Sequence, residues 1–438
     1  MNYTETISYM YDKLPMFTRI GEAAIKKDLT NTLALCQALG QPQEAFKTIH
    51  IAGTNGKGSV SHLLASILQS TGLKVGLYTS PHLLDFRERM RVNGQVIPES
   101  SVIKFIAENQ TNIENIAPSF FELTVAMAFD FFRNEKVDIA VIETGLGGRL
   151  DSTNIILPEL SIITNISFDH QNLLGNTLPE IAFEKAGIIK EGIPVVIGKS
   201  SPETAPVFIE KAKACHSNIT FAEPSFPVIN YNYQEGMLHI NYQNGDEQIH
   251  ISSVLAGLYQ IENIATVLTA VKQLNAINIP ISDAATIEGI KEVKKNTGFL
   301  GRWEIIRQNP LIICDVAHNE AGLKAIFDQL KSIPHAHLHF VYGMVKDKDI
   351  EKALQLLPRE ATYYFTQPQL PRALDYLSLH EYATNKGLQG NAYPNIAEAC
   401  AAALVRQKPD NILLISGSIF VVAEALEYFQ NMKMYQTN

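Results

Sequence analysis

The sequence predicts an α/β protein of two domains, each built around a mostly parallel β-sheet. Apolar, strand-like segments alternate with helix-like segments in two separate runs along the chain. The stretch KNTGFLGRWE, residues 295–304, interrupts the alternation with two glycines. A chain of 438 residues is also too long for one ordinary core. We therefore predict an N-terminal domain over residues 1–296 and a smaller C-terminal domain over residues 297–438.

In the N-terminal domain, five apolar segments have the β-branched content of buried strands. These segments are residues 48–52, 74–80, 137–143, 160–167 and 193–198. Residues 226–252 instead alternate with period two around QEG and QNGD turns, which predicts antiparallel hairpins at the edge of this domain. Two helices are expected to follow, over residues 259–275 and 281–295.

In the C-terminal domain, strands and helices alternate afresh in a Rossmann-like pattern. The predicted strands are residues 311–316, 337–344, 362–367 and 411–418. The predicted helices are residues 321–332, residues 349–357 and one long helix before the last strand. Because G-x-G-x-x-G is missing from this domain, dinucleotide binding is not indicated.

Composition narrows the possible partners. The net charge of −9 argues against a broad nucleic-acid-binding surface. The chain begins without a basic region that leads into an apolar stretch, and it has no run of about 18 apolar residues, so neither a signal peptide nor a membrane span is expected. Four scattered cysteines match no metal or redox spacing and suit reduced thiols. We expect a cytoplasmic monomer.

The segment Gly53–Ser59, GTNGKGS, is a candidate phosphate-binding loop. The usual pattern is G-x-x-x-x-G-K-[ST], whereas here Gly58 follows Lys57 and the hydroxyl comes one residue late. The loop joins a predicted strand to a predicted helix, so that free backbone N–H groups and a helix N-terminus point at one spot. A tight turn with a solvated lysine is the alternative.

Three polar residues follow predicted strands, where the ligands of parallel sheets bind. Glu143 ends a buried strand before a glycine-rich turn, and its carboxylate could hold Mg²⁺ beside phosphates or merely cap a helix. His170 and Ser80 follow neighbouring strands and are further candidate ligands, although each is weak alone. Lys185 would be dismissed as a solvated helical lysine on residue type.

Two histidine-bearing segments lie in the predicted C-terminal domain. Asp315 and His318 lead from a strand end into a helix start, where Asn319 is a good N-cap, so the turn could have a capping role only. The segment HAHLH, residues 335–339, places three histidines on one strand face. With no acid or cysteine nearby in sequence, it indicates a partly exposed face rather than a metal site.

Seven segments together resemble, in order, the folylpolyglutamate synthase/dihydrofolate synthase family of Mur-ligase-like amide ligases. They are HIAGTNGKGSV, LYTSPHLLDFRERMRVNG, IETGLGGRLDSTN, FDHQNLLGNTLPEIAFEKAGI, YQIENIATVL, GRWE and DVAHN. The resemblance covers nearly the whole chain. It implies that GTNGKGS is the family's own phosphate loop in an ATP-binding domain, and that the C-terminal domain is a glutamate ligase domain.

The resemblance implies an ATP-dependent ligase that adds L-glutamate to dihydropteroate, to reduced folates or to both, through an acyl phosphate. It also implies Mg²⁺ at two sites, a carboxylated Lys185 and room for a monovalent cation. Little covalent chemistry falls to the protein in such a reaction. Positioning and charge neutralisation carry most of the catalysis.

The resemblance assigns roles residue by residue. ATP contacts fall on Thr54, Asn55, Gly56, Lys57, Gly58, Ser59, Asn263, Arg302 and Asp315. Metal ligands fall on Ser80, Glu143, His170 and Lys185. Substrate contacts fall on Phe121, Asp151, Ser152 and Ser418, and catalytic roles on Lys57, Glu143, His170, Lys185 and His318. Residues Ser80–Gly94, here called the substrate loop, resemble a mobile loop over the folate whose arginines would gain ordering partners only with an anionic ligand.

One segment departs from the family, and three alternatives stay open. Residues 28–31, Asp-Leu-Thr-Asn, replace a G-L-x-R type segment, so no contact is predicted there. A monofunctional folylpolyglutamate synthase would share every catalytic motif. A cell-wall Mur ligase is disfavoured by the TSPHL loop, and a non-catalytic nucleotide-binding protein by the retained Lys57, Glu143, His170 and Lys185.

Overall fold

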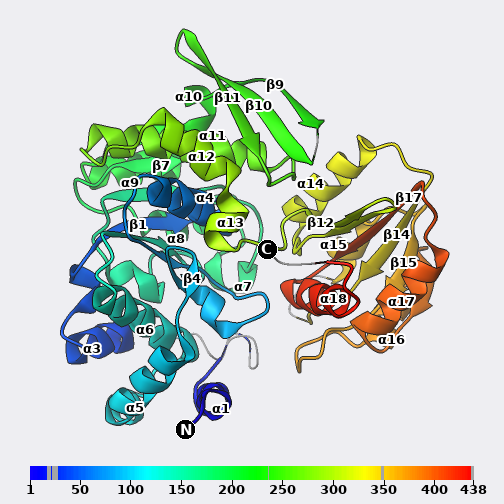
Figure 1. Ribbon diagram of the computed structural model, residues 1–438, viewed down its shortest axis with the longest axis horizontal. Helices are drawn as coiled ribbons and strands as arrows, with labels where there is room; N and C mark the ends of the chain where they lie inside the picture. The colour runs from blue at the N-terminus through cyan, green and yellow to red at the C-terminus, as the bar shows by residue number, and fades with distance from the viewer. Residues whose placement is uncertain (17–20, 22–27, 235, 347–349, 436–438) are drawn as a thin grey trace. The chain divides into compact units, whose positions relative to one another are not determined.

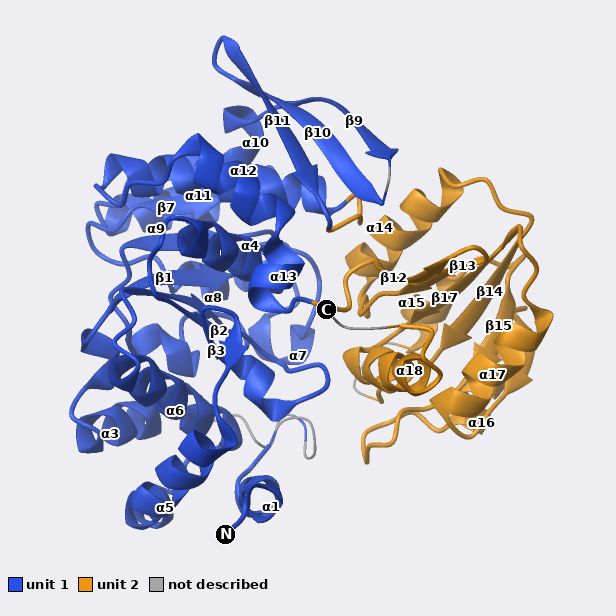
Figure 2. Ribbon diagram, viewed as in Figure 1, with its two compact units in different colours: residues 1–254, 259–299 blue, residues 255–258, 300–438 orange. Residues whose placement is uncertain are grey.

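The computed structural model describes residues 1–16, 21, 28–234, 236–346 and 350–435, which form two compact units (Figure 2). The first unit comprises residues 1–254 and 259–299. The second comprises residues 255–258 and 300–438. The boundary after Phe299 falls inside the segment that the sequence indicates as a linker. Residues 255–258, which precede the linker, belong to the second unit, and this was not predicted.

An eight-stranded sheet forms the centre of the first unit, in the order β4-β3-β2-β5-β1-β6-β7-β8 (Figure 1). The strands are β1 (Lys47–Ala52), β2 (Val75–Tyr78), β3 (Met90–Val92), β4 (Gln95–Val96), β5 (Ile139–Glu143), β6 (Leu160–Ile163), β7 (Val195–Ile197) and β8 (Ile219–Phe221). From β2 to β8 all neighbours are parallel, which confirms the predicted parallel sheet. Antiparallel β3 and β4 extend one edge and were missed because they are only three and two residues long.

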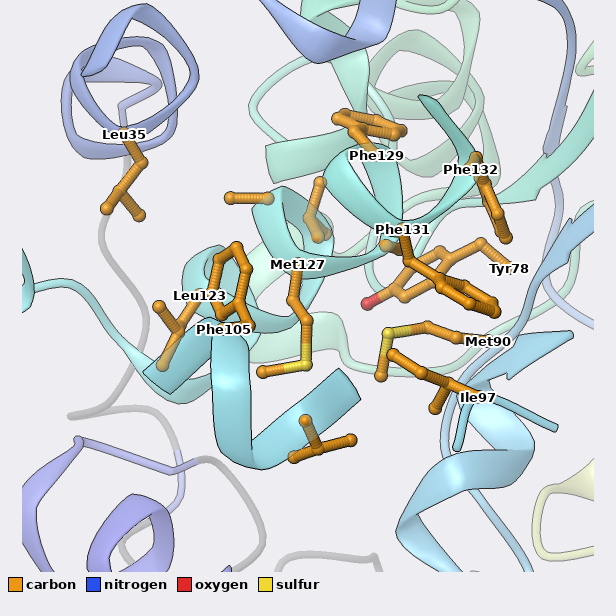
Figure 3. Close-up of a cluster of buried hydrophobic side chains, with 14 of the residues drawn as sticks. Leu35, Tyr78, Met90, Ile97, Phe105, Leu123, Met127, Phe129, Phe131 and Phe132 are labelled. Carbon is orange, nitrogen blue, oxygen red and sulfur yellow. The ribbon is translucent and has the colours of Figure 1, made fainter. Parts of the chain in front are cut away.

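Helices cover both faces of this sheet (Figure 1). They are α1 (Tyr3–Lys13), α3 (Thr30–Ala38), α4 (Lys57–Ser70), α5 (Glu99–Ile116), α6 (Phe120–Asn134), α7 (Gln171–Leu174), α8 (Leu178–Ala186), α9 (Ala205–Ala214), α10 (Ala222–Ser225), α11 (Gln260–Ala276), α12 (Asp283–Lys291) and α13 (Val293–Thr297). The 3₁₀ turns are η2 (Pro42–Glu44), η3 (Phe86–Arg89) and η4 (Ser152–Ile155). Figure 3 shows Leu123, Met127 and Phe129 of α6 gathered with Tyr78 of β2 in the core on one face. Helices α4 and α11 lie against the other face.

Helix α4 agrees with its prediction from the sequence and is largely buried. Gly56, with φ of 84°, precedes its first residue, and Gly72, with φ of 89°, follows its end, as the sequence indicates. Every residue from Ser59 to Leu68 is buried, because α4 packs against the sheet on one side and against α11, α12 and α13 on the other. Burial on all sides fixes the direction in which its N-terminus points.

The predicted hairpins form a separate three-stranded sheet instead of adding to an edge of the large one. Its strands are β9 (Val228–Gln234), β10 (Met237–Asn244) and β11 (Glu247–Ser253), with β10 in the middle. Along β10, Leu238, Ile240 and Tyr242 are fully buried, and the Tyr242 hydroxyl donates to the Ile261 carbonyl of α11. The alternating apolar residues therefore attach this sheet to helices, which the sequence pattern alone could not specify.

The second unit contains a six-stranded sheet in the order β12-β13-β17-β14-β15-β16, in which only the β12–β13 pair is antiparallel. The strands are β12 (Glu304–Gln308), β13 (Leu311–Cys314), β14 (His337–Tyr342), β15 (Thr362–Phe365), β16 (Gln389–Ala392) and β17 (Asn411–Ser416). Helices α14 (Glu320–Lys331), α15 (Ile350–Gln355) and α16 (Tyr376–Asn385) share a core on one face. Helices α17 (Ile396–Arg406) and α18 (Ile419–Asn431) contact the sheet and each other.

The single long helix predicted before the last strand is wrong, because α16, β16 and α17 occupy that region. Gly387, with φ of 83°, follows α16, and the Asn395 side chain caps the start of α17. The prediction for HAHLH also fails in part: His335 precedes β14, and His339 is buried with hydrogen bonds to Tyr364 and Asn411. Among the helices described, none is both long and apolar enough to span a membrane.

Gly289 provides a test of the packing that holds α4. A Cβ atom at this position of α12 would lie 2.4 Å from the Ile67 Cα atom, and the Gly289 carbonyl accepts a hydrogen bond from Ser66 of α4. Gly289→Ala should therefore lower the free energy of unfolding by about 1–3 kcal/mol, measured by urea denaturation. Ala284→Ser, at an exposed position of the same helix, is the control. Equal denaturation midpoints for both variants would contradict the expected overpacking.

Candidate functional site

The glycine loop after β1 is held in place by the segment that follows β6. A Cβ atom on Gly53, whose φ is 147°, would lie 1.9 Å from the Thr164 hydroxyl oxygen, so only glycine fits there. The Thr164 hydroxyl donates to the Asn55 carbonyl at 2.6 Å. The Thr54 N–H donates to the Asn165 carbonyl at 2.9 Å, and the Asn55 N–H donates to the Asn165 side chain at 3.0 Å. These contacts fix the backbone of the loop.

The N-terminus of α4 opens directly from this loop. Gly56 supplies no capping side chain, and no acidic residue lies in the first turn of α4. Such a helix end presents unsatisfied N–H groups and a partial positive charge to an anion. The Lys57 ammonium folds back and donates to the carbonyls of Gly53 at 3.1 Å and Thr54 at 3.2 Å. The loop therefore has the geometry of a phosphate-binding site.

A residue that the sequence did not single out, Gln260, links this loop to α11. Its side chain donates to the Ser59 hydroxyl at 3.1 Å and accepts from the Asn263 amide at 2.9 Å. The Asn263 amide oxygen lies 2.3 Å from where a Cβ of Gly56 would be. Asn263 is therefore at the loop, where the resemblance places a nucleotide contact.

Glu143 and Ser80 meet at the carboxyl edge of the sheet. Glu143 ends β5, the neighbour of β1, and its side chain is 4% exposed. Its Oε2 atom accepts a hydrogen bond of 3.1 Å from the Ser80 N–H, just beyond β2. Two of the predicted metal ligands are therefore adjacent, and both offer oxygen atoms.

Lys185 of α8 is buried, contrary to what its residue type suggests. Its ammonium group donates a hydrogen bond of 2.8 Å to the Gly53 carbonyl. Burial, and secondly the charge of Lys57, lower the pKa of Lys185 to about 7, while Asp169 and Asp151 act in the opposite direction. Two lysines thus share one carbonyl oxygen of the phosphate loop. The lowered pKa favours the neutral amine of Lys185.

The segment after β6 also carries Asp169 and His170. His170, with φ of 50°, precedes α7, and its Nε2 atom lies 3.8 Å from the Asp169 carboxylate. The Asp169 side chain is 8% exposed and acts electrostatically on Lys185. Asp169 was not a predicted site residue, although its place directly before His170 could have indicated it.

The three residues of the first unit with predicted substrate contacts lie around the glycine turn that follows β5. The Phe121 ring is so near this turn that a Cβ on Gly145 would lie 2.4 Å from its Cζ atom. Asp151 is 4% exposed, and its Oδ2 atom accepts a hydrogen bond of 2.8 Å from the Leu146 N–H. Burial raises the pKa of the Asp151 carboxyl, although the hydrogen bonds that it accepts oppose this shift. Ser152 follows it and is also buried.

The expectation that the arginines of the substrate loop lack partners without ligand is wrong. Arg87 forms an ion pair of 2.7 Å with Asp85. Arg89 is 4% exposed and donates to the His82 ring at 2.8 Å, and Arg91 donates to a backbone carbonyl at 3.0 Å. Part of the loop also forms η3 and β3, which explains the order of these side chains without a ligand.

In the second unit, Asp315 directly follows β13 and holds the turn that contains Arg302. Its carboxylate accepts hydrogen bonds from the Trp303 N–H at 2.7 Å and from the Ala317 N–H at 2.9 Å. Because Trp303 has a φ of 47°, this turn needs such support. Asp315 therefore fixes the backbone next to Arg302.

His318 and Ser418 lie at the same edge of the second sheet, because β13 and β17 are parallel neighbours. The His318 Nδ1 atom is 3.0 Å from the Val316 carbonyl and so carries the proton. The Ser418 hydroxyl accepts from the Val421 N–H as the N-cap of α18, and Asn319 caps α14 as the sequence indicates. The second unit therefore brings its four predicted site residues to one edge.

Comparison with known proteins agrees with this geometry. Residues 51–271 match the Mur ligase middle domain, and residues 301–419 match the Mur ligase glutamate ligase domain. The chain is 34% identical over 437 residues to the folylpolyglutamate synthase of Lacticaseibacillus casei, and the aligned region covers 97% of each chain. It is 31% identical to the dihydrofolate synthase/folylpolyglutamate synthase of Bacillus subtilis, with 96% of this chain and 98% of the relative covered.

The chain belongs to the folylpolyglutamate synthase/dihydrofolate synthase family. Its fold also matches that of Escherichia coli FolC in complex with DHPP and ADP, with a TM-score of 0.86, 28% identity and 99% of each chain covered. The confirmed family membership makes the protein an ATP-dependent, amide-forming ligase. The glycine loop, Gly53–Ser59, lies within the residues that match the Mur ligase middle domain.

The residues of this folylpolyglutamate synthase-type site suit Mg²⁺ but do not form a closed metal cage. Within the described part of the chain, no group of three or more His, Cys, Asp or Glu residues could hold a metal ion. Mg²⁺ is usually bound through one or two carboxylates, with phosphate oxygens and water as its other ligands. Glu143, buried beside Ser80, fits that arrangement, in which the nucleotide completes the site.

Lys57 offers a test of the phosphate loop in this family member. Lys57→Ala should lower ATP turnover at least ~100-fold, because the ammonium group neutralises charge that develops on the transferred phosphoryl group. Lys47→Ala, an exposed position on β1, should leave turnover unchanged. Phosphate release and circular dichroism would be measured for both variants. Near-normal turnover by a folded Lys57→Ala enzyme would contradict the assigned role.

Proposed function

We propose that this enzyme adds L-glutamate both to dihydropteroate and to reduced folates at the expense of ATP. One observation carries the proposal. The first unit joins a glycine phosphate loop to the buried Lys185, whose ammonium rests on the Gly53 carbonyl, while the buried Glu143 ends the neighbouring strand. The Bacillus subtilis relative, which is named for both activities, supports the assignment of two acceptors.

In the first step, an oxygen of the acceptor carboxylate attacks the γ-phosphorus of ATP, and ADP leaves. A carboxylate is a poor electrophile, and the acyl phosphate that forms is a good one. The loop N–H groups and the start of α4 hold the phosphates, and Lys57 moves from two backbone carbonyls to the phosphoryl oxygens. When bound, Mg²⁺ neutralises phosphate charge, with Ser80, Glu143 and His170 as the residues that would hold it.

In the second step, the amine of glutamate attacks the acyl carbon, the amide bond forms and inorganic phosphate leaves. The attacking nitrogen must lose a proton. His318 suits this task because its Nδ1–H donates to the Val316 carbonyl, so the lone pair is on Nε2. Arg302, Asp315 and Ser418 provide the remaining contacts to nucleotide and glutamate in this proposal.

Lys185 is proposed to carry a carboxyl group on its amine. Only a neutral amine reacts with CO₂, and burial beside Lys57 supplies one near neutral pH. The product exchanges a cation for an anion with two oxygen atoms, which suits a second Mg²⁺. It also relieves the repulsion between Lys57 and Lys185 on the Gly53 carbonyl. A monovalent cation could then bind at the same negative group.

A second candidate function is that of a monofunctional folylpolyglutamate synthase. The observation in its favour is that the Lacticaseibacillus casei relative, at 34% identity, is named for this activity alone. We further propose that the enzyme acts as a cytoplasmic monomer. Its four cysteines are buried and free, as in reducing compartments.

A phosphate-release assay with three acceptors separates these functions. Dihydropteroate and tetrahydrofolate, each with ATP and glutamate, should both give phosphate and ADP. A muramyl nucleotide with its amino acid should give none. Activity with tetrahydrofolate alone would establish the monofunctional alternative, and activity with the muramyl nucleotide alone would overturn the proposal.

The pH dependence of activity tests the state of Lys185. Because its pKa is lowered to about 7 from 10.5, the amine is protonated below pH 7 and cannot react with CO₂. Activity should therefore fall as the pH drops through 7, and added bicarbonate should restore part of it above that pH but little below it. Rates would be recorded from pH 6 to 9 with and without bicarbonate.

Substitution tests the same group independently of pH. Lys185→Ala should lose most activity and regain part of it with a short-chain carboxylic acid, which returns a carboxylate to the pocket. Lys213→Ala, an exposed lysine on α9, should behave like the wild type. A fully active Lys185→Ala enzyme without added acid would show that the modified lysine is not needed.

A further inference from the structure

A buried chain of hydrogen bonds joins β1 to the glycine turn after β5. The His50 Nε2 atom lies 2.8 Å from the Thr153 hydroxyl, which in turn donates to the Asp151 Oδ1 atom at 2.5 Å. His50 and Thr153 are fully buried, and Asp151 is 4% exposed. His50 is three residues before Gly53 on the strand that leads into the phosphate loop, and it is the first residue of the motif HIAGTNGKGSV, but neither the resemblance nor the proposed chemistry gives it a role.

The direction of this chain follows from counting protons. The Thr153 hydroxyl has one proton, and it goes to the Asp151 carboxylate. The hydroxyl oxygen must then accept a hydrogen bond from His50, whose ring proton is therefore on Nε2. Burial lowers the pKa of His50 to about 3, so that the ring stays neutral. Its Nδ1 atom has no hydrogen-bond partner in the described part of the chain.

The chain ends on a carboxylate that shapes the acceptor side of the site. Asp151 Oδ1 accepts from both the backbone and the hydroxyl of Thr153, while Oδ2 accepts from the Leu146 N–H of the glycine turn. The same turn packs on Phe121 through Gly145. A small rotation of the carboxylate would therefore move the turn and the surface beside the aromatic ring together.

We propose that His50 is a positioning residue for the acceptor substrate, which acts through Thr153 to fix the orientation of the Asp151 carboxylate. A carboxylate held in this way can accept hydrogen bonds from the N–H groups of an amino-substituted heterocyclic ring stacked near Phe121. The inference rests on the proposed function, and it takes Asp151, a substrate contact implied by the family resemblance, as a contact of the acceptor. It adds a residue from the nucleotide-binding strand to the recognition of the other substrate.

A purely structural role of His50 makes a different prediction. A buried polar group that only fills space can be replaced by an apolar one at little cost when its partner is replaced too. Such a change would alter stability but not the affinity for one substrate. A positioning role requires that the KM for the acceptor respond while the KM for ATP does not.

Two pairs of variants test this distinction. His50→Leu removes the donor, whereas His50→Gln keeps an N–H group near the position of Nε2. Thr153→Val removes the hydroxyl, whereas Thr153→Ser keeps it. We expect His50→Leu and Thr153→Val to raise the KM for tetrahydrofolate about tenfold, the size expected when one hydrogen bond of the chain is lost. The KM for ATP should stay within about twofold, and the Gln and Ser variants should approach the wild type.

The double variant and a neighbouring control complete the test. Because both residues act along one chain, His50→Leu with Thr153→Val should be no worse than Thr153→Val alone. Thr48→Val, buried two residues earlier on β1, controls for damage to the strand and should leave both KM values unchanged. If His50→Leu fails to fold, the Thr153 pair gives the same comparison.

The results test the positioning role of His50 and the proposed function of the enzyme separately. Equal changes in both KM values, or no change in either, would overturn the positioning role in an enzyme that is otherwise active. A wild-type protein inactive with both dihydropteroate and tetrahydrofolate would overturn the proposed function and this inference with it. Nitrogen NMR of labelled histidine adds a direct check, since a His50 ring protonated on Nδ1 would contradict the chain.

Discussion

The close approach of Gly53 to Thr164 is the constraint on which the rest of the site depends. No side chain fits between them, since a Cβ on Gly53 would lie 1.9 Å from the Thr164 hydroxyl oxygen. This contact seats the glycine loop on the segment after β6 and leaves the Gly53 carbonyl facing two ammonium groups, those of Lys57 and Lys185. The half-buried Lys57 ammonium and the start of α4 lie beside this oxygen and provide positive charge for a phosphate. The loop is thus prepared for an anion before any ligand binds.

The parallel order of the strands brings the other groups to this point. Because β5 and β6 flank β1, Glu143 and the Asp169 segment reach the same edge as the glycine loop. The second unit repeats the principle with β13 and β17, whose ends carry Asp315 and Ser418. In both units, the polar side chains that would contact a charged ligand lie at or just after the end of a strand. The sheet holds the backbone most rigidly there. Positioning of this kind suits a reaction in which the protein makes no covalent bond to substrate.

The residues predicted to contact the acceptor substrate lie on turns and helix ends rather than at strand ends. Asp151 and Ser152 follow the glycine turn, and Phe121 is the second residue of α6. At the segment that departs from the family pattern, Asn31 donates to Glu122 beside Phe121 at 3.2 Å, so this region still packs against the predicted substrate contacts. A hydrogen-bonded chain from His50 reaches the same turn from the nucleotide side. Strand β1 is therefore connected both to the glycine loop and to the turn that carries the predicted acceptor contacts.

Local patterns in the sequence predicted most of the parallel strands, the limits of α4 and the glycine loop, because periodicity and glycine placement act over a few residues. The parallel strands β8 and β16 were not predicted. The family motifs identified most candidate residues. Only the tertiary structure decided that Lys185 is buried on Gly53, that Asp169 faces it and that Gln260 joins the loop to α11. These contacts join residues far apart in the chain, and charge and burial depend on such partners rather than on neighbours. For the same reason the short strands β3 and β4, which exist only through pairing with β2 and each other, could not be predicted from the sequence.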